Sequence, residues 1–211
     1  MSWIIQWLIS SYNTVVTNIA FDAVSKNEWV WSRTFSHTIS WTNTILFVCS
    51  MLTSWSTSAV TYNGVSLTNI TNRTFSGWSW QASLWYIVNP TSWANNIVVT
   101  TSWWYTRAVA TSYTWAKQTS QPDAFSSNFN DSGVSTFTSV VTTVWSNCWH
   151  VAWCYANTSG ISAWSWTTLR TTSWDSAMFD SNWVVSWTST LNMTNASSWN
   201  YVVVWASFLP A

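Results

Sequence analysis

Short runs of alternating apolar and polar residues recur along this chain, and this period of two constrains the fold more than any other feature. Such alternation places successive side chains on opposite faces of a β-strand, whereas a helix needs apolar residues three and four positions apart. The runs are rich in Val, Ile, Thr, Tyr and Phe and end at Ser, Asn or Gly. They predict strands at 19–24, 33–39, 44–51, 59–62, 65–68, 83–88, 96–101, 107–113, 135–144, 148–155, 167–172, 189–193 and 200–208.

Short strands without intervening amphipathic helices predict an all-β chain, an antiparallel β-sandwich of jelly-roll (concanavalin- or LamG-like) type made of two sheets. A closed barrel is the alternative. Asn63-Gly64 lies between two alternating runs and predicts a two-residue type I′ hairpin. We expect residues 1–18 to form a lead-in or docking segment and 19–211 a single sandwich domain, with 118–133 as a crossover loop.

Charge and hydropathy argue against nucleic acid as a partner, a membrane-spanning helix and a secretory signal. Only 6% of residues are charged and the formal net charge is zero, so the sequence offers no basic face for nucleic acid. No run of eighteen apolar residues predicts a membrane-spanning helix. The N-terminus lacks the basic region and cleavage site of a secretory signal, so we expect none.

Tryptophan is abundant where glycine is expected. The chain has 23 Trp but only 4 Gly, whereas soluble domains average about 7% Gly. Many of the tryptophans follow Ser and lie beside Thr, Asn or Asp, which are the usual neighbours of turn glycines. Each exposed Trp would present about 150–250 Å² of aromatic surface. We therefore predict that UGA codons for glycine were translated as tryptophan, a reassignment that some uncultivated bacteria and their phages use.

Three tryptophans depart from this pattern: Trp85, Trp149 and Trp153 lie inside apolar runs, where an aromatic side chain suits a strand. Reading the rest as glycine gives a Gly content of roughly 11%, which suits a turn-rich β protein. The alternative is a protein whose indoles bind sugars or partner chains. In that case Trp103, Trp104, Trp164 and Trp166 are the candidate ligand-binding residues.

The candidates for cysteine and histidine chemistry are few. Cys148, His150 and Cys154 share one face of a strand, but their spacing is not that of a zinc ribbon, so we expect no metal and free, packed thiols. His37 shares its parity with Phe35 and Ile39, which favours a sheet residue over a catalytic base.

Acidic residues are equally sparse. The six carboxylates include no closely spaced pair of the kind found in jelly-roll glucanases. Two loops could offer oxygen ligands to Ca²⁺, with Asn130, Asp131, Asp180 and Asn182 as weak candidates. We favour the alternative that these residues form Asx turns by bonding their own backbone. We expect no catalytic residues and no cofactor.

Several segments carry a resemblance once the suspect tryptophans are read as glycine. They are Ile-Ala-Phe-Asp-Ala-Val-Ser (19–25), Phe-Ser-His-Thr (35–38), Val-Thr-Tyr-Asn-Gly-Val-Ser-Leu-Thr (60–68), Leu-Trp-Tyr-Ile-Val-Asn-Pro (84–90) and Ala-Asn-Asn-Ile-Val-Val-Thr (94–100). The chain after residue 18 resembles β-sandwich modules of phage structural proteins and of surface proteins of uncultivated bacteria. The resemblance implies a lectin-like jelly roll on a virion or extracellular surface, and no catalytic residues.

From these observations we expect a non-enzymatic structural or adhesive module that forms homo-oligomers, assembles with other virion or surface proteins, or binds glycans. The alternatives are a carbohydrate-binding lectin with genuine Trp platforms and, third, a glycan hydrolase.

Overall fold

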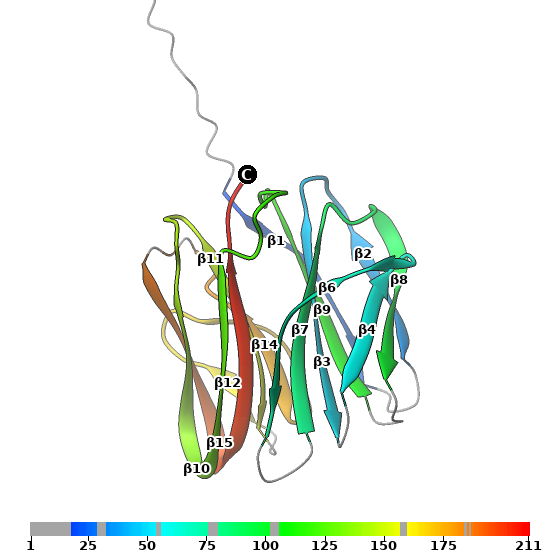
Figure 1. The fold of residues 1–211 in the computed structure, drawn as a ribbon. Helices are drawn as coiled ribbons and strands as arrows, with labels where there is room; N and C mark the ends of the chain where they lie inside the picture. The colour runs from blue at the N-terminus through cyan, green and yellow to red at the C-terminus, as the bar shows by residue number, and fades with distance from the viewer. Residues whose placement is uncertain are drawn as a thin grey trace, which may run out of the picture.

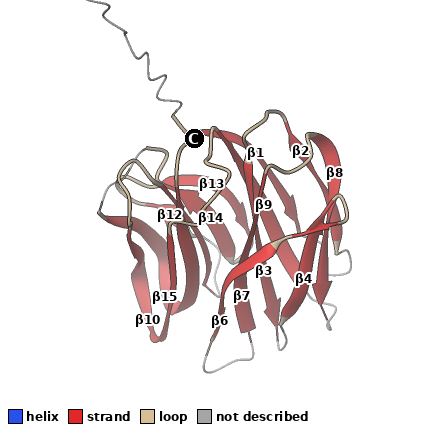
Figure 2. Ribbon diagram, turned by 45° about the horizontal axis from the view of Figure 1, so that its top comes forward, coloured by secondary structure: helices blue, strands red, loops and turns tan. Residues whose placement is uncertain are grey.

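A computed structural model describes residues 18–28, 33–53, 56–75, 80–101, 106–156, 160–183, 185 and 187–211. Residues 1–17 of the predicted lead-in segment lie outside this range. The described secondary structure consists of strands in antiparallel sheets (Figure 2). The prediction of an all-β chain is confirmed.

The strands alternate with short turns along the chain. They are β1 (Ala20–Asn27), β2 (Thr34–Ile39), β3 (Ile45–Thr53), β4 (Thr57–Tyr62), β5 (Val65–Ser66), β6 (Thr68–Thr74), β7 (Trp80–Val88), β8 (Trp93–Thr101), β9 (Thr106–Thr114), β10 (Ala124–Thr142), β11 (Trp149–Ala156), β12 (Ser162–Ala163), β13 (Thr168–Ser173), β14 (Ser176–Asp180) and β15 (Thr188–Phe208).

The described strands form three sheets where the sequence led us to expect two. The central sheet has the order β1-β9-β3-β7-β6. The N-terminal outer sheet, β2-β8-β4-β5, covers one of its faces, and the C-terminal outer sheet, β10-β15-β11-β14-β13, covers the other. Figure 1 shows the central sheet between the two outer ones.

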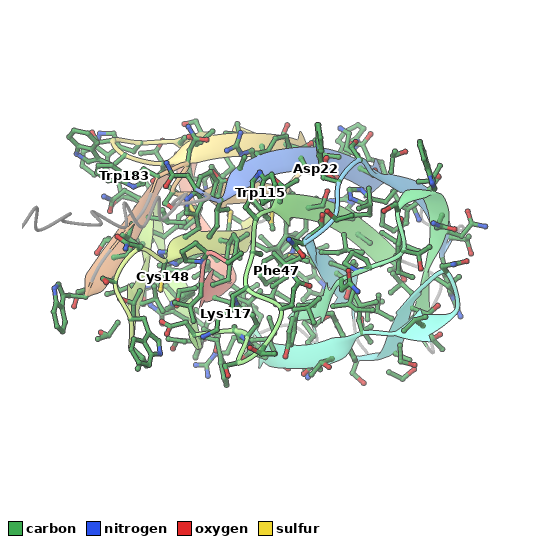
Figure 3. The ribbon with its side chains drawn as sticks, turned by 90° about the horizontal axis from the view of Figure 1, so that it is seen from above. Asp22, Phe47, Trp115, Lys117, Cys148 and Trp183 are labelled. Carbon is green, nitrogen blue, oxygen red and sulfur yellow. The ribbon has the colours of Figure 1, made fainter. Side chains whose placement is uncertain are left out.

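The inner strands β3 and β9 of the central sheet are buried on both faces, and β3 is apolar at most consecutive positions. In β3, Phe47 and Cys49 pack toward the C-terminal outer sheet, whereas Leu46 and Val48 pack toward the N-terminal one. Viewed from above, Phe47 lies in the interior, and its ring is 5.1 Å from that of Phe208 in β15 (Figure 3). A strand buried on both faces reads as a continuous apolar run, as β3 does.

The C-terminal outer sheet is also covered on its far side. Strands β10 and β15 pair at 124–130 with 201–207 and again at 136–142 with 188–194, with register shifts between these two stretches. Side chains from the second stretch, such as Phe137 and Leu191, pack with Ala152 and Cys154 of β11 and Val203 of β15. The long β10–β15 ribbon therefore bends and covers its own sheet.

Several local predictions can be compared with the strands. The hairpin at Asn63-Gly64 is confirmed: Tyr62 pairs with Val65, and both turn residues have positive φ, 49° and 76°. The predicted crossover loop at 118–133 is wrong beyond residue 123, since β10 begins at Ala124. The two predicted strands at 189–193 and 200–208 are parts of one long strand, β15.

Candidate functional site

His37 lies on the inward face of β2 between two serine hydroxyls. Its Nδ1 is 2.8 Å from Ser25 Oγ and its Nε2 is 3.0 Å from Ser112 Oγ. Ser112 Oγ donates its only proton to Asp22 Oδ2 at 2.8 Å, so it accepts one from Nε2. Nδ1 therefore accepts from Ser25. Burial lowers the pKa of His37 to about 4, although the Asp22 carboxylate opposes this shift, and the ring is neutral near pH 7.

His150 on β11 is held in the same manner. Its Nδ1 is 3.1 Å from Ser189 Oγ of β15, and its Nε2 is 3.4 Å from Ser139 Oγ of β10. Burial lowers the pKa of His150 to about 3. Both histidines are sheet residues with their ring nitrogens occupied. For His37 this agrees with the prediction from strand parity.

The three thiols are free and buried, as expected. Burial raises the pKa of Cys148 to about 12 and raises the pKa values of Cys49 and Cys154 as well, which disfavours the reactive thiolate. Within the described ranges, no group of three or more His, Cys, Asp or Glu side chains is placed to hold a metal ion.

Two carboxylates, the buried Asp180 and the half-buried Asp175, are paired with arginine side chains. Asp180 at the end of β14 accepts from Arg170 Nε at 2.5 Å and Nη2 at 3.0 Å, and also from the Tyr113 hydroxyl at 2.9 Å. Arg107 of β9 forms an ion pair with Asp175. Burial raises the pKa of Asp180, against the lowering effect of Arg170.

The calcium candidates make other bonds. Arg170 also donates to Asn182 Oδ1 at 2.6 Å, so a guanidinium lies where a cation between Asp180 and Asn182 would bind. Asn130 Oδ1 accepts from the Ser132 backbone N–H at 2.8 Å, which is an Asx turn. Asp131 follows Asn130 in β10. Calcium at these residues stays the weaker alternative, and at one of the two loops the Arg170 guanidinium holds the place of the cation.

The candidate aromatic platform is partly described. Trp103 and Trp104 lie outside the described residues. Trp164 and Trp166 are exposed, and the Trp166 ring stacks on that of Trp183 with centroids 5.0 Å apart and planes 4° apart. Figure 3 shows Trp183 near one end of the molecule. The sequence did not single out Trp183, because its contact with Trp166 joins separate turns.

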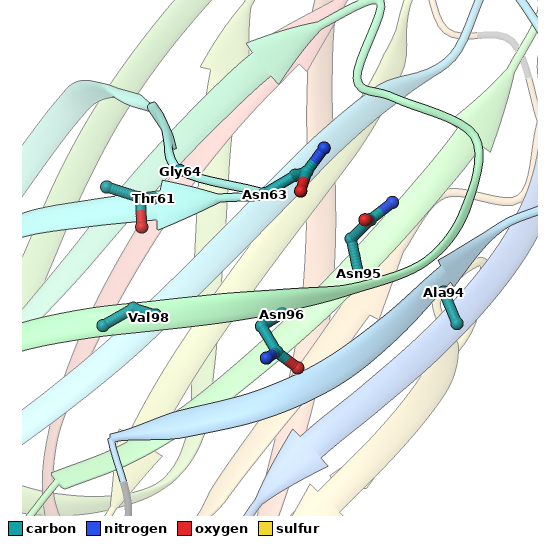
Figure 4. A pocket seen from close by; sticks show the side chains of 7 residues that line it. All are labelled: Thr61, Asn63, Gly64, Ala94, Asn95, Asn96 and Val98. Carbon is teal, nitrogen blue, oxygen red and sulfur yellow. The ribbon is translucent and has the colours of Figure 1, made fainter.

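A polar hollow of about 370 Å³ lies on the N-terminal outer sheet (Figure 4). It is open to solvent and lies where the β4–β5 hairpin meets β8. Its lining carries amide, hydroxyl and methyl groups and no charged side chain: Thr61, Asn63, Gly64, Ala94, Asn95, Asn96 and Val98. The sequence predicted the hairpin but not the hollow, because Asn63 and Asn96 meet only through sheet pairing.

Asn95 anchors one wall of this hollow. Its amide nitrogen donates to the Ser92 carbonyl at 3.2 Å, and the Tyr62 hydroxyl donates to the Trp93 carbonyl at 2.9 Å. Asn96, in contrast, is exposed on the outward face of β8. Amides of this kind both donate and accept hydrogen bonds, as the hydroxyls of neutral sugars do.

Comparison with known proteins gives no match to any family model, any curated protein or any solved structure. The described part of the chain contains no helix that is long and apolar enough to cross a membrane.

Proposed function

We propose that this protein is a non-enzymatic structural or adhesive module of a virion, phage appendage or cell surface, which self-assembles or binds neutral glycans. The uncharged hollow at Asn63 and Asn96 carries the proposal. Three amide side chains around an open depression suit hydroxyl groups better than they suit charged ligands. A kinship with jelly-roll, lectin-like modules is part of the same proposal.

The surface around the hollow supports this assignment. Outward-facing residues of β2 and β8 include Thr34, Ser36, Thr38 and Thr100, which are exposed and uncharged. The inward-facing residues of the same strands, such as Ile39 and Ile97, form the core. An uncharged face of this type can contact a glycan chain or a neighbouring subunit without desolvating a charge.

Both histidines and two of the six carboxylates, groups that acid-base catalysis could use, are engaged in structural contacts. His37 and His150 are neutral and bonded to serines, and the carboxylates of Asp175 and Asp180 are paired with arginines. A hydrolase would need two free carboxyl groups across a substrate. These contacts favour binding or assembly over hydrolysis.

A glycan array combined with size-exclusion chromatography tests the proposal. We expect either retention of neutral glycans or a concentration-dependent oligomer, together with co-purification with particles. Asn96→Ala should weaken glycan retention, whereas Asn18→Ala, a matched exposed asparagine before β1, should not. A protein that stays monomeric, binds no glycan and separates from particles would contradict the proposal.

A second candidate function is a lectin that uses genuine indole platforms. The exposed Trp166–Trp183 stack favours it, because aromatic faces pack against the apolar faces of sugars. In that case Trp166→Ala should abolish retention on the array, while Asn96→Ala should leave it intact.

A further inference from the structure

Tryptophan occupies a backbone conformation that favours glycine. Eleven non-glycine residues have positive φ among the described residues: five Asn, one Ser and five Trp. Asn adopts this left-handed region with little penalty, whereas a bulky side chain there is an outlier. The five tryptophans are Trp93 (76°), Trp115 (59°), Trp166 (67°), Trp174 (42°) and Trp187 (63°).

Two of these positions occupy turns whose type calls for glycine. Trp174 is the first of two residues joining β13 to β14, where Ser173 pairs with Ser176. Positive φ at only the first central residue is the pattern of a type II′ hairpin, in which glycine holds that place. Trp166 is the third residue of a turn closed by the Thr167 N–H and the Trp164 carbonyl, at 3.1 Å. Positive φ at that position indicates a type II turn, which also selects glycine.

At these five positions the backbone makes the structural contacts, and the indole is largely exposed to solvent. Their side chains are 40–78% exposed. Some of their carbonyls accept structural hydrogen bonds: that of Trp187 accepts from Thr143 N–H at 2.6 Å, and that of Trp115 accepts from Ala211 N–H at 2.7 Å. A residue whose backbone is fixed and whose side chain is exposed can be replaced by glycine without loss of core packing.

We propose that positions 93, 115, 166, 174 and 187 carry glycine in the protein as its native host makes it, because UGA encodes glycine there. This inference is independent of the proposed function. It removes the ring of residue 166 from the Trp166–Trp183 stack, and with it the aromatic platform that favours the lectin.

Four other tryptophans have the opposite environment. Trp85, Trp149 and Trp153 are buried in β7 and β11. From the sequence, Trp205 is among the positions expected to be glycine. In the structure it is 3% exposed in β15, and its indole nitrogen donates to the Val140 carbonyl at 2.8 Å. We therefore revise the expectation for Trp205 and place it with the genuine tryptophans.

Thermal unfolding of single Trp→Gly variants tests the inference. Relief of the left-handed strain should raise the Tm by about 2–4 °C for each of Trp93→Gly, Trp166→Gly, Trp174→Gly and Trp187→Gly. Trp41→Gly and Trp145→Gly are matched controls, since both indoles are 63% exposed but neither residue has positive φ. The controls should leave the Tm unchanged or lower it, because glycine only adds freedom to the unfolded chain.

The inference is overturned if the variants at positive φ behave like the controls. If the tryptophan-containing chain gives no cooperative melt, peptide masses from the native protein decide: tryptophan at all five positions overturns the inference, and glycine supports it.

Discussion

The two buried histidines of this protein are neutral and hydrogen-bonded to their neighbours. Each histidine lies between two serine hydroxyls, and each donates or accepts at both ring nitrogens. The neutral imidazole suits this arrangement because it has one donor and one acceptor. Protonation would replace an acceptor with a donor inside the core, so these sites link stability to pH.

Stability should fall as the pH drops below about 6.5. The pKa values of His37 and His150 are lowered to about 4 and about 3 by burial. Above pH 6.5 neither the folded nor the unfolded imidazole holds the extra proton. As the pH falls, the unfolded chain takes up protons first, and at pH 5 the free energy of unfolding should be lower by roughly 2 kcal/mol per histidine. Urea denaturation at pH 7 and pH 5 measures this loss.

Replacement of either histidine provides the control for that experiment. His37→Gln and His150→Gln should each remove part of the difference in unfolding free energy between pH 7 and pH 5. An identical difference in the parent and both variants would contradict the assignment to these groups.

Trp205 should behave as a core residue. Trp205→Gly removes a buried ring and should cost about 3–5 kcal/mol, whereas Trp205→Phe keeps an aromatic ring but loses the bond to the Val140 carbonyl, at about 1 kcal/mol. Urea denaturation of the two variants measures both. A Trp205→Gly variant as stable as the parent would show that the side chain does not fill the core.

At the scale of elements, local sequence predicted strands wherever apolar alternation and turn residues agree. The runs of β3, β9 and β11 and the Asn63-Gly64 hairpin are of this type. The start of β10 was missed because its residues include Ser, Asn, Asp and Gly, which have low strand propensity. Pairing with β15 holds this segment as a strand, and a single sequence does not display such long-range pairing.

In the candidate site, too, local sequence predicted the orientation of a residue but not its partners from other strands. The inward orientation of His37 followed from the parity of its strand, but its partners Ser25 and Ser112 lie on β1 and β9. The hollow joins Asn63 of one hairpin to Asn96 of β8. Such contacts depend on sheet order and register, which local alternation leaves open.

The hairpin between β4 and β5 offers a test of backbone strain at one turn. A Cβ at Gly64 would meet no atom within 4 Å, so any cost of Gly64→Ala comes from the positive φ of 76°. We expect a loss of about 1–2 kcal/mol in the free energy of unfolding. Asn63→Gly, at the adjacent left-handed position, should lose less, and a Gly64→Ala variant without loss would contradict the turn geometry.

At the scale of the whole molecule, two outer sheets depend on one central sheet. An aromatic core containing Phe47, Tyr113, Trp149 and Phe208 joins the central and C-terminal outer sheets. The Tyr113 hydroxyl crosses the same interface to reach Asp180. The two halves of the chain therefore share both apolar and polar contacts.

Asp180, with its partners Arg170 and Tyr113, should contribute strongly to the stability of the interface between the central and C-terminal outer sheets. Asp180→Asn leaves the Arg170 charge without its buried partner and should cost about 3–5 kcal/mol. Tyr113→Phe removes one hydrogen bond and should cost about 1–2 kcal/mol. Equilibrium unfolding of both variants checks these values. A loss below about 1 kcal/mol for Asp180→Asn would contradict the described pairing.

The identity of the turn residues determines what surface the whole molecule presents. With tryptophan at the left-handed positions, the protein carries five exposed indoles there; with glycine, those five indoles are absent and the Ser, Thr and Asn residues beside them make up more of the surface. Mass spectrometry of peptides from the protein isolated from its native host distinguishes these directly. We predict glycine at positions 93, 115, 166, 174 and 187 and tryptophan at 85, 149, 153 and 205. Tryptophan at every one of these positions would contradict the account.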